Sequence, residues 1–419
     1  MTFKIITLGC KVNAYESEIM KELLIKAGYK EEKDKPEVVI INTCSVTNMA
    51  DSKSKKMVRR YKRENSDTIL IVCGCSTQNN KEEYEKMDID ILLGNKDKSK
   101  IVTLINNYKN NHEKYFKFYD DRDLEFEDMN VDKFSSHTRA FVKIQDGCNN
   151  FCSYCIIPYV RGNIRSKDFT KTLEEIKRLV DNGHKEIVLT GIHTGSYGHG
   201  LNYDLSDLLH EMAKIEGLER IRISSIEVTE LNDKFLKELK NNKKICNHMH
   251  IPLQAGSDEI LKKMNRKYTL DYFFNKINEI RNIRPDISIT TDVIVGHPYE
   301  TNDLFEKTID TCKKLKFAKI HVFPYSKRDG TASSRMPHQV DEQEKKLRSH
   351  KLIEVSNELE LIYNNKFIGK NLDILIEEVN NNIAIGHTSN YLKLVLSGNY
   401  QKNKIYNVEI KKEYLNNEK

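Results

Sequence analysis

The stretch GCNNFCSYC, residues 147–155, places three cysteines in one short loop with the spacing C-x3-C-x2-C. A structural zinc site normally has four protein ligands, and a [4Fe–4S] cluster has four iron atoms to hold. Three thiolates therefore leave one iron of such a cluster open to a small molecule with oxygen and nitrogen donors. The alternative is a zinc site completed by a distant histidine, and the loop alone does not decide between the two. The histidines considered for that role are His193, His248 and His250.

The loop lies in a series of alternating strands and helices. It follows the apolar run RAFVKIQ (139–145), and five further strand candidates begin near residues 185, 219, 246, 286 and 317. Strands separated by helices indicate a parallel sheet, and six of them indicate a partial barrel rather than a complete eight-stranded one. We expect this domain to span residues 137–368 and to close with a long helix over about 341–367. In such barrels the catalytic groups gather where the strands end, as these cysteines do.

A second set of three cysteines lies nearer the N-terminus. Strand candidates at 3–9, 37–43, 68–74 and 89–94 alternate with helical stretches, which predicts a doubly wound parallel sheet over residues 1–112. Cys10, Cys44 and Cys75 each directly follow one of its first three strands. Because parallel strands end at one edge of a sheet, we expect these thiols to converge as metal ligands. Cys73, Cys246 and Cys312 are expected to pack in the core.

Two further segments complete the chain. Residues 113–136 contain the acidic run DDRDLEFEDMN (120–130), which predicts a solvated linker. Residues 369–419 contain short strand patterns without helical ones, which indicates a small antiparallel β-barrel of the kind that binds oligonucleotides.

Composition sets the broad class. Hydrophobic residues make up 38% and charged residues 31% of the 419 residues, and the net charge of +6 allows a nucleic-acid partner without requiring one. No apolar run approaches the roughly 18 residues of a membrane span, and the N-terminus does not read as a signal peptide. We therefore expect a cytoplasmic protein without membrane contact. In that compartment nine cysteines favour metal ligation or catalysis over disulfides.

With its flanks, GCNNFCSYCIIPYVRG resembles the radical S-adenosylmethionine superfamily. LGCKVN (8–13), NTCSVT (42–47) and GCSTQ (74–78) resemble the cysteine motifs of its methylthiotransferase family, as do HIPLQAGSDEILKKMNRKYT (250–269) and TDVIVGHPYET (291–301). LGCKVN, TGIHTGSYG (190–198) and GHTSNYLK (386–393) are most similar to the branch that methylthiolates N6-threonylcarbamoyladenosine beside the tRNA anticodon. Sister branches act on isopentenyladenosine in tRNA or on a ribosomal protein. A zinc-stabilised RNA-binding protein is the non-enzymatic alternative.

The resemblance implies two [4Fe–4S] clusters and S-adenosylmethionine as cofactors. Cys148, Cys152 and Cys155 match the ligands of the cluster that binds S-adenosylmethionine, and Cys10, Cys44 and Cys75 match those of an auxiliary cluster. It further implies that a 5′-deoxyadenosyl radical attacks the substrate, that the auxiliary cluster carries the sulfur, and that the two cysteine sets face each other. The residues matched to the S-adenosylmethionine site are Phe151, Tyr154, Thr190, Gly191, Ser225, Glu227 and Gly296.

The chain departs from the family pattern at three places, one of which is the additional Cys73. His297, Pro298 and Tyr299 stand where a Phe-Pro-Gly run is common, and Ala255 stands where serine is frequent. These departures affect the shape of the pocket but remove no cluster ligand.

Partners follow from the same resemblance: a tRNA substrate and an electron donor protein that the sequence does not identify. We expect Arg161 and Arg165 to bind substrate or cofactor carboxylates, and Lys393 to contact the tRNA backbone. The basic helix near residues 50–63 is more typical of a solvated face than of a phosphate site. We expect a monomer.

Overall fold

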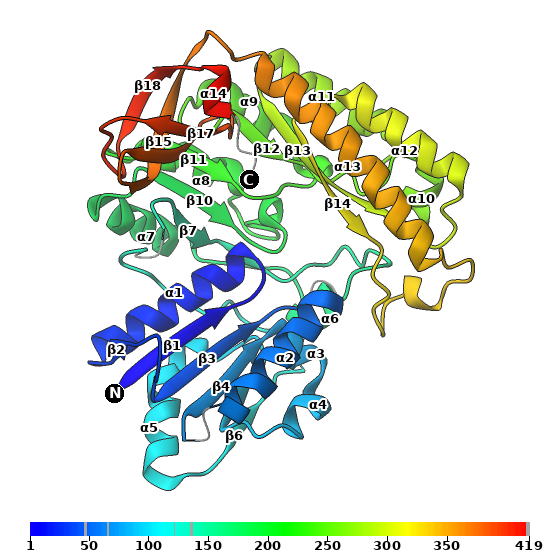
Figure 1. The fold of residues 1–419 in the computed structure, drawn as a ribbon. Coiled ribbons are helices and arrows are strands. Elements are labelled where there is room, and N and C mark those ends of the chain that lie inside the picture. The colour runs from blue at the N-terminus through cyan, green and yellow to red at the C-terminus, as the bar shows by residue number, and fades with distance from the viewer. Residues whose placement is uncertain (46–47, 65–66, 121, 135–136, 416–419) are drawn as a thin grey trace.

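The structure is a computed structural model that describes residues 1–45, 48–64, 67–120, 122–134 and 137–415. Figure 1 shows an N-terminal unit coloured blue to cyan, a larger central unit coloured green to orange, and a small C-terminal sheet in red that lies beside the central strands. No helix among these residues is long and apolar enough to cross a bilayer.

The N-terminal unit is a six-stranded parallel sheet in the order β2-β1-β3-β4-β5-β6. The strands are β1 (Thr2–Thr7), β2 (Lys30–Glu31), β3 (Val38–Thr43), β4 (Ile69–Gly74), β5 (Ile91–Leu93) and β6 (Tyr115–Lys117). The helices are α1 (Lys11–Lys26), α2 (Asn48–Glu64), α3 (Cys75–Asn79), α4 (Lys81–Glu85) and α5 (Ile101–Asn111).

Both faces of this sheet are buried, as the apolar run VVII in β3 requires. Val38 and Ile40 pack with apolar residues of α1 and α5, and Val39 and Ile41 pack on the other face with Val58 of α2. Successive side chains of a strand point to opposite faces, so the uninterrupted apolar strand serves two cores at once. The predicted doubly wound arrangement is confirmed, but the sheet runs to β6, beyond the expected boundary at residue 112.

The linker prediction for residues 113–136 is wrong in its second half. Met129, Val131 and Phe134 are buried in the same hydrophobic core as the central strands. Lys167 also donates to the Met129 carbonyl at 2.9 Å. This segment therefore packs against the central unit instead of lying in solvent.

The central unit contains two three-stranded parallel sheets, with the strand orders β11-β10-β7 and β12-β13-β14. A parallel bridge between Ile221 and Ile245 links the two sheets. The strands are β7 (Ala140–Lys143), β10 (Glu186–Thr190), β11 (Arg220–Ile223), β12 (His248–His250), β13 (Ser288–Val295) and β14 (Lys319–Pro324). A short antiparallel pair, β8 (Gln145–Asp146) and β9 (Arg165–Ser166), flanks the cysteine loop.

Helices cover the outside of these strands. They are α7 (Phe169–Asp181), α8 (Leu205–Ala213), α9 (Asp233–Asn241), α10 (Asp258–Lys263), α11 (Leu270–Ile283), α12 (Asn302–Leu315) and α13 (Glu342–Asn365), whereas the short α6 (Ile157–Arg161) lies against α3 of the N-terminal unit. The long helix expected near 341–367 is α13, and it packs along β14 (Figure 1).

The C-terminal unit is a four-stranded antiparallel sheet in the order β17-β16-β15-β18. Its strands are β15 (Asn371–Asn380), β16 (Ile383–Thr388), β17 (Lys393–Ser397) and β18 (Ile405–Glu409), and α14 (Lys412–Leu415) follows them. A closed barrel was expected, but β17 and β18 do not pair with each other in the part of the chain that the structure describes. The core of this sheet includes Tyr363 and Phe367 from the end of α13 and the residues after it.

Candidate active site

The three N-terminal cysteines lie at one edge of the first sheet. Strands β1, β3 and β4 are neighbours, and Cys10, Cys44 and Cys75 each follow the end of one of them. Gly9 makes the close approach possible, because its φ is +109° and a Cβ there would lie 2.8 Å from the Cys44 sulfur. Asn13 joins the loops by donating to the Leu8 carbonyl at 2.8 Å and the Thr43 carbonyl at 2.9 Å.

The second cysteine loop is built from tight backbone contacts. The N–H of Cys148 donates to the Gly162 carbonyl at 3.1 Å, and the N–H of Ser153 donates to the Met264 carbonyl at 2.9 Å. Gly147 has a φ of +73°, and a Cβ there would overlap the Asn163 carbonyl. These contacts hold the loop against the β8–β9 pair and the end of α10.

Two arginines donate hydrogen bonds to the thiols. Arg161 Nε lies 3.1 Å from the Cys75 sulfur, and Arg266 Nη1 lies 3.4 Å from the Cys152 sulfur. Burial raises the pKa of the Cys75 and Cys155 thiols, to about 12 for Cys155. A thiolate at either position therefore needs a cation or metal ion beside it.

Arg161 is not placed to bind a substrate carboxylate, contrary to the sequence expectation. Its guanidinium is fully buried and pairs with Glu16 at 3.2 Å and with Asp146 at 3.1 Å. Burial opposes the charge of Glu16, but Lys98, Lys143 and Arg161 outweigh it and hold the pKa of that carboxyl far below its usual range. Because Glu16 lies in α1 and Asp146 in β8, this network joins the two units.

Arg165 also differs from expectation. It donates to the carbonyls of Arg161 and Asn163 at 2.6 and 3.1 Å and pairs with Asp146 at 3.1 Å. Its side chain is only 12% exposed, and its contacts are with residues on either side of the cysteine loop. Lys393, at the start of β17, is exposed, and its contact with RNA stays a prediction.

The loops that carry the N-terminal cysteines lie against the loop that carries Cys148, Cys152 and Cys155. Cys75 packs with Ile156 and Val160, which directly follow the second cysteine loop. Arg328 donates to the Ser45 carbonyl and, at 2.7 Å, to Asn48 Oδ1, and it interacts electrostatically with both Cys44 and Cys155. Arg328 lies in none of the motifs quoted above, whereas Arg266 lies in the block HIPLQAGSDEILKKMNRKYT (250–269) but had no role assigned to it.

A cavity of about 190 Å³ opens beside this junction. Tyr154 and Cys155 line it from the loop, Gln254 and Asp292 from the strands, and Arg328 from the segment after β14. Phe151 lies outside it, with its ring against Tyr159 and under the Arg122 guanidinium. Of the two loop aromatics matched to the cofactor site, only Tyr154 reaches this cavity.

The remaining matched residues lie at or after strand ends. Thr190 is the buried last residue of β10, Gly191 follows it, and Ser225 follows β11. Glu227 pairs with Arg266, the same arginine that donates to Cys152. Gly296 has a φ of +76°, and a Cβ there would meet the Lys345 side chain at 2.4 Å, which explains the glycine.

The histidines considered as a fourth ligand lie in different places. His193 Nδ1 lies 4.0 Å from the Cys148 sulfur, while its Nε2 pairs with Glu230 at 2.9 Å. His248 stacks on Tyr391, and His250 pairs with Asp292 at 3.2 Å. Within the described ranges, no three His, Cys, Asp or Glu side chains converge on a single metal ion.

The cysteines assigned to the core are buried, as predicted. Cys73 is fully inaccessible and packs in the core between the first sheet and α1 and α5, and Cys246 and Cys312 are likewise buried. Burial raises the pKa of Cys73 to about 12.

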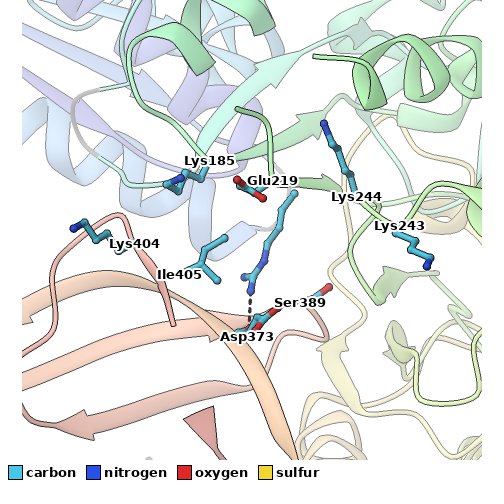
Figure 2. Close-up of a pocket in the computed structure, with 9 residues that line it drawn as sticks. Lys185, Glu219, Lys243, Lys244, Asp373, Ser389, Lys404 and Ile405 are labelled. Carbon is cyan, nitrogen blue, oxygen red and sulfur yellow. Dashed lines mark hydrogen bonds between the residues drawn. The ribbon is translucent and has the colours of Figure 1, made fainter. Parts of the chain in front are cut away.

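The protein has basic side chains in two places where a polyanion could bind, on α2 and in a cavity beside the C-terminal sheet. Five of the seven cations on α2 are paired: Lys55 with Asp51 and Glu83, Arg59 with Glu83, Arg60 and Arg63 with Glu64, and Lys62 with Asp88 and Asp90. Figure 2 shows a second surface, a cavity of about 510 Å³ between the central strands and the C-terminal sheet. Its basic residues are Lys185, Arg220, Lys243, Lys244 and Lys404, against the carboxylates of Glu219 and Asp373.

This basic cavity lies at the N-terminal ends of β10, β11 and β12, whereas the cysteine loops follow C-terminal ends. It is therefore on the opposite side of the central unit from the thiols. Arg220 is held there by carbonyl oxygens of the C-terminal sheet, at 2.6 Å from Asp373 and 2.9 Å from His387.

Two family models match the chain: the Radical SAM superfamily over residues 142–312 and Uncharacterized protein family UPF0004 over residues 2–94. Threonylcarbamoyladenosine tRNA methylthiotransferase MtaB of Bacillus subtilis is 42% identical, covering 94% of this chain and 89% of that protein. The protein of the same name from Thermotoga maritima is 38% identical over 95% of this chain and 92% of its own length. The tRNA-2-methylthio-N(6)-dimethylallyladenosine synthase of Clostridium novyi is 39% identical over 90% and 85%.

The fold has solved counterparts. The radical S-adenosylmethionine methyltransferase TsrM from Kitasatospora setae matches with a TM-score of 0.55 at 13% identity, covering 77% of this chain and 72% of that one. At this identity the match shows a shared α/β architecture with parallel sheets.

Proposed function

Because the chain belongs to the methylthiotransferases of the radical S-adenosylmethionine superfamily, we propose that it methylthiolates C2 of N6-threonylcarbamoyladenosine, the base 3′ of the tRNA anticodon. The observation that carries this proposal is the apposition of two cysteine triads from separate units, joined through Arg161 and Arg328. One triad alone would suit electron transfer or radical formation, but the transfer of sulfur to carbon needs a sulfur source at the same place.

The residues fit two iron–sulfur clusters. Each triad consists of three thiols, and one thiol of each receives a guanidinium hydrogen bond of the kind that tunes cluster sulfurs. Cys10, Cys44 and Cys75 would hold the auxiliary cluster, and Cys148, Cys152 and Cys155 the cluster that binds S-adenosylmethionine. When bound, the clusters supply the electron that cleaves S-adenosylmethionine and the sulfur that is transferred, chemistry that acid–base side chains cannot supply at an unactivated C–H bond.

The chain itself positions the reactants. Tyr154 and Cys155 line the cavity beside the junction, and Ile156 and Ile157 give it an apolar wall that keeps water away from a radical. Arg266 joins Cys152 to Glu227, so the matched ribose-contacting segment and the cysteine loop are held together. The roles of Phe151, Thr190, Gly191, Ser225 and Gly296 toward S-adenosylmethionine stay predictions.

We assign the C-terminal sheet to RNA binding as a TRAM-like module and the six central strands to a partial barrel. The basic cavity of Figure 2 supports the first assignment, since five cations and two carboxylates leave it positive where the sheet meets the central unit. The proposed setting is a cytoplasmic monomer that receives electrons from a separate donor protein.

Two measurements test the function. Oxygen-free protein should contain about eight iron atoms per chain, two clusters of four. Nucleosides from cells lacking the gene should lack the 2-methylthio form of threonylcarbamoyladenosine and accumulate its precursor. About four iron atoms, zinc in place of iron, or an unchanged nucleoside would each contradict the proposal. Loss of 2-methylthio isopentenyladenosine, or of a modified ribosomal protein, would assign the chain to a sister branch.

A further inference from the structure

The basic cavity shown in Figure 2 is formed by two units of the protein, and neither unit forms it alone. The central unit supplies Lys185, which precedes β10, and Lys243 and Lys244, which precede β12. The C-terminal unit supplies Lys404 and Ile405 at the start of β18. Most of the positive charge therefore comes from outside the C-terminal sheet that we assign to RNA binding.

Hydrogen bonds between the two units hold the walls of the cavity in place. The hydroxyl oxygen of Ser389 accepts from the N–H of Asn247 at 2.9 Å. Asn403, the neighbour of Lys404, donates to the Gly183 carbonyl at 2.7 Å. The backbone segments that carry the lysines are therefore held at a fixed distance from each other.

The charge in the cavity is not balanced. Lys244 donates to the Ile215 carbonyl at 2.8 Å, a contact that does not compensate its charge. Four lysines therefore face two carboxylates, Glu219 and Asp373, and Asn407 already donates to the second of these at 2.8 Å. Among the residues that the structure describes, no carboxylate pairs with Lys185, Lys243 or Lys404. The cavity keeps a net positive charge and attracts anions.

The composition of the lining favours a phosphate backbone over a small organic ligand. Sites for small molecules are mostly apolar and rich in aromatic side chains. Among the described residues that line this cavity, Ile405 is the only apolar one and none is aromatic. Figure 2 shows Lys185 and Lys404 on one side of the cavity and Lys243 and Lys244 on the other. Cations spread in this way match the phosphates that repeat along a nucleic-acid strand.

The place of the cavity determines which part of an RNA can reach it. The cavity lies at the N-terminal ends of β10 and β11, whereas the cysteine loops lie beyond C-terminal strand ends. β10 alone has five residues, which span about 17 Å. RNA that places one base in the active site must therefore follow the outside of the central unit to reach the cavity. The segment in the cavity is then not the loop that carries the base.

Building on the proposed function, we propose that this cavity binds backbone phosphates of the substrate tRNA outside the anticodon stem-loop. Lys185, Lys243 and Lys404 bind the phosphates, while the anticodon loop enters the active site on the other side of the central unit. The tRNA is therefore held at two places, one that takes the base and one that binds the body of the molecule. Because lysine contacts to phosphate carry no base information, the second place contributes affinity and not sequence preference.

The test compares full-length tRNA with the anticodon stem-loop isolated from it. Binding of each RNA to the iron-loaded enzyme is measured by fluorescence anisotropy at several salt concentrations. The triple variant Lys185→Gln, Lys243→Gln, Lys404→Gln should bind full-length tRNA on the order of 10- to 100-fold more weakly. The slope of log affinity against log salt should become shallower by about 2 to 3, since each lost phosphate contact removes about 0.7 to 0.9. The stem-loop should bind with nearly unchanged affinity and slope.

Two control variants distinguish lost contacts from damage and from a general effect of charge. Arginine in place of the same three lysines keeps the charge and should preserve the affinity for full-length tRNA. A second control neutralises three exposed lysines of the N-terminal unit, Lys30→Gln, Lys33→Gln and Lys35→Gln. It should change neither affinity by more than about twofold, because charges farther than a Debye length from the RNA are screened.

Three results overturn the proposal. The first is an unchanged affinity for full-length tRNA in the triple glutamine variant. The second is an equal loss for tRNA and stem-loop, because the cavity would then hold the anticodon arm itself. The third is an equal loss in the N-terminal control, which would show a general effect of charge. Failure of the proposed function is distinguishable, because binding does not depend on which base is modified: conversion of isopentenyladenosine alone would contradict the proposed substrate, while the loss of tRNA affinity would still be observed.

Discussion

Arg161, which ends a helix of the central unit, donates a hydrogen bond from Nε to the sulfur of Cys75 in the N-terminal unit at 3.1 Å. The same guanidinium binds Glu16 and Asp146, so the first arginine after one cysteine loop supports a thiol of the other. The two triads are therefore coupled through one fully buried side chain.

Replacing this arginine should affect both stability and metal content. Arg161→Gln leaves part of the charge on Glu16 and Asp146 uncompensated in the interior, and breaking a buried pair in this way costs about 3–5 kcal/mol. Denaturant unfolding of the apoprotein measures this loss. In the reconstituted protein, iron should fall from about eight toward about four per chain as the auxiliary cluster is lost. Arg178→Gln is the control, since its half-exposed guanidinium pairs with Asp132 at the surface and should cost less than about 1 kcal/mol. Equal losses in the two variants would refute the assigned role.

Gly9 and Gly28 both have positive φ, but only at Gly9 would an added methyl group meet neighbouring atoms. Alanine substitutions at the two positions therefore distinguish the effect of crowding from that of backbone strain. Gly9→Ala would place a methyl group 2.7 Å from Cys44 Cβ and should displace that thiol, so the auxiliary iron should be lost. At Gly28 no atom lies within 4 Å of the added methyl group, so Gly28→Ala should cost only about 1–2 kcal/mol of backbone strain and retain full iron. Iron analysis after anaerobic reconstitution decides the matter, and full loading of Gly9→Ala would contradict the crowding argument.

Arg328 should control how well radical formation is coupled to product. Arg328 lines the cavity, and its contacts to Ser45 and Asn48 hold the segment after Cys44 beside it. Arg328→Gln removes these contacts. We expect S-adenosylmethionine cleavage to continue, while methylthiolated product per 5′-deoxyadenosine falls on the order of 10- to 100-fold, because misplacement of about 1 Å has effects of this size. The exposed Arg335 provides the control substitution, Arg335→Gln, which should leave the ratio unchanged. An unaltered ratio in Arg328→Gln would exclude a coupling role.

Acid should destabilise the protein through His297. Burial lowers its pKa to about 4 from an ordinary value of 6.5, and its Nε2 lies 3.2 Å from Ser153 Oγ in the cysteine loop. The unfolded chain takes up a proton first as pH falls below 6.5, so stability is lost between pH 6.5 and pH 4 and no further below it. For this one group the loss is about 3 kcal/mol.

The check is denaturant unfolding of the apoprotein at several pH values between 7 and 4. His297→Gln should flatten the pH dependence by that amount, whereas His350→Gln, at an exposed position on α13, should not. Identical pH profiles for all three proteins would mean that His297 does not stay neutral in the folded state.

The parts of the fold that the sequence predicted best are the strands that a short run of apolar residues identifies. Strand β3 opens with the apolar run VVII because both faces of the sheet are covered, and Cys44 and Cys75 mark where β3 and β4 end. Strand β6 was missed because its three residues are exposed and lie at the edge of the sheet. The acidic run at 120–130 suggested solvent, but the apolar residues that anchor this segment are Met129 at the end of the run and Val131 and Phe134 just after it.

In the site, too, residues marked by local sequence were predictable, and residues that depend on distant contacts were not. Thiols at strand ends were predictable, since a parallel sheet brings its strand ends to one edge. The burial of Arg161 was not, because its partner Glu16 lies 145 residues away and no local pattern joins them.

The order of the chain has a consequence for biogenesis. Cys10, Cys44 and Cys75 leave the ribosome well before Arg161, and the first sheet has all its strands by residue 117. An assembly factor that delivered iron and sulfide to the nascent N-terminal unit would meet a triad without its guanidinium. Maturation of this centre is therefore expected to finish only after translation has passed residue 161, and ribosome-bound truncations ending on either side of that point would retain iron to different extents.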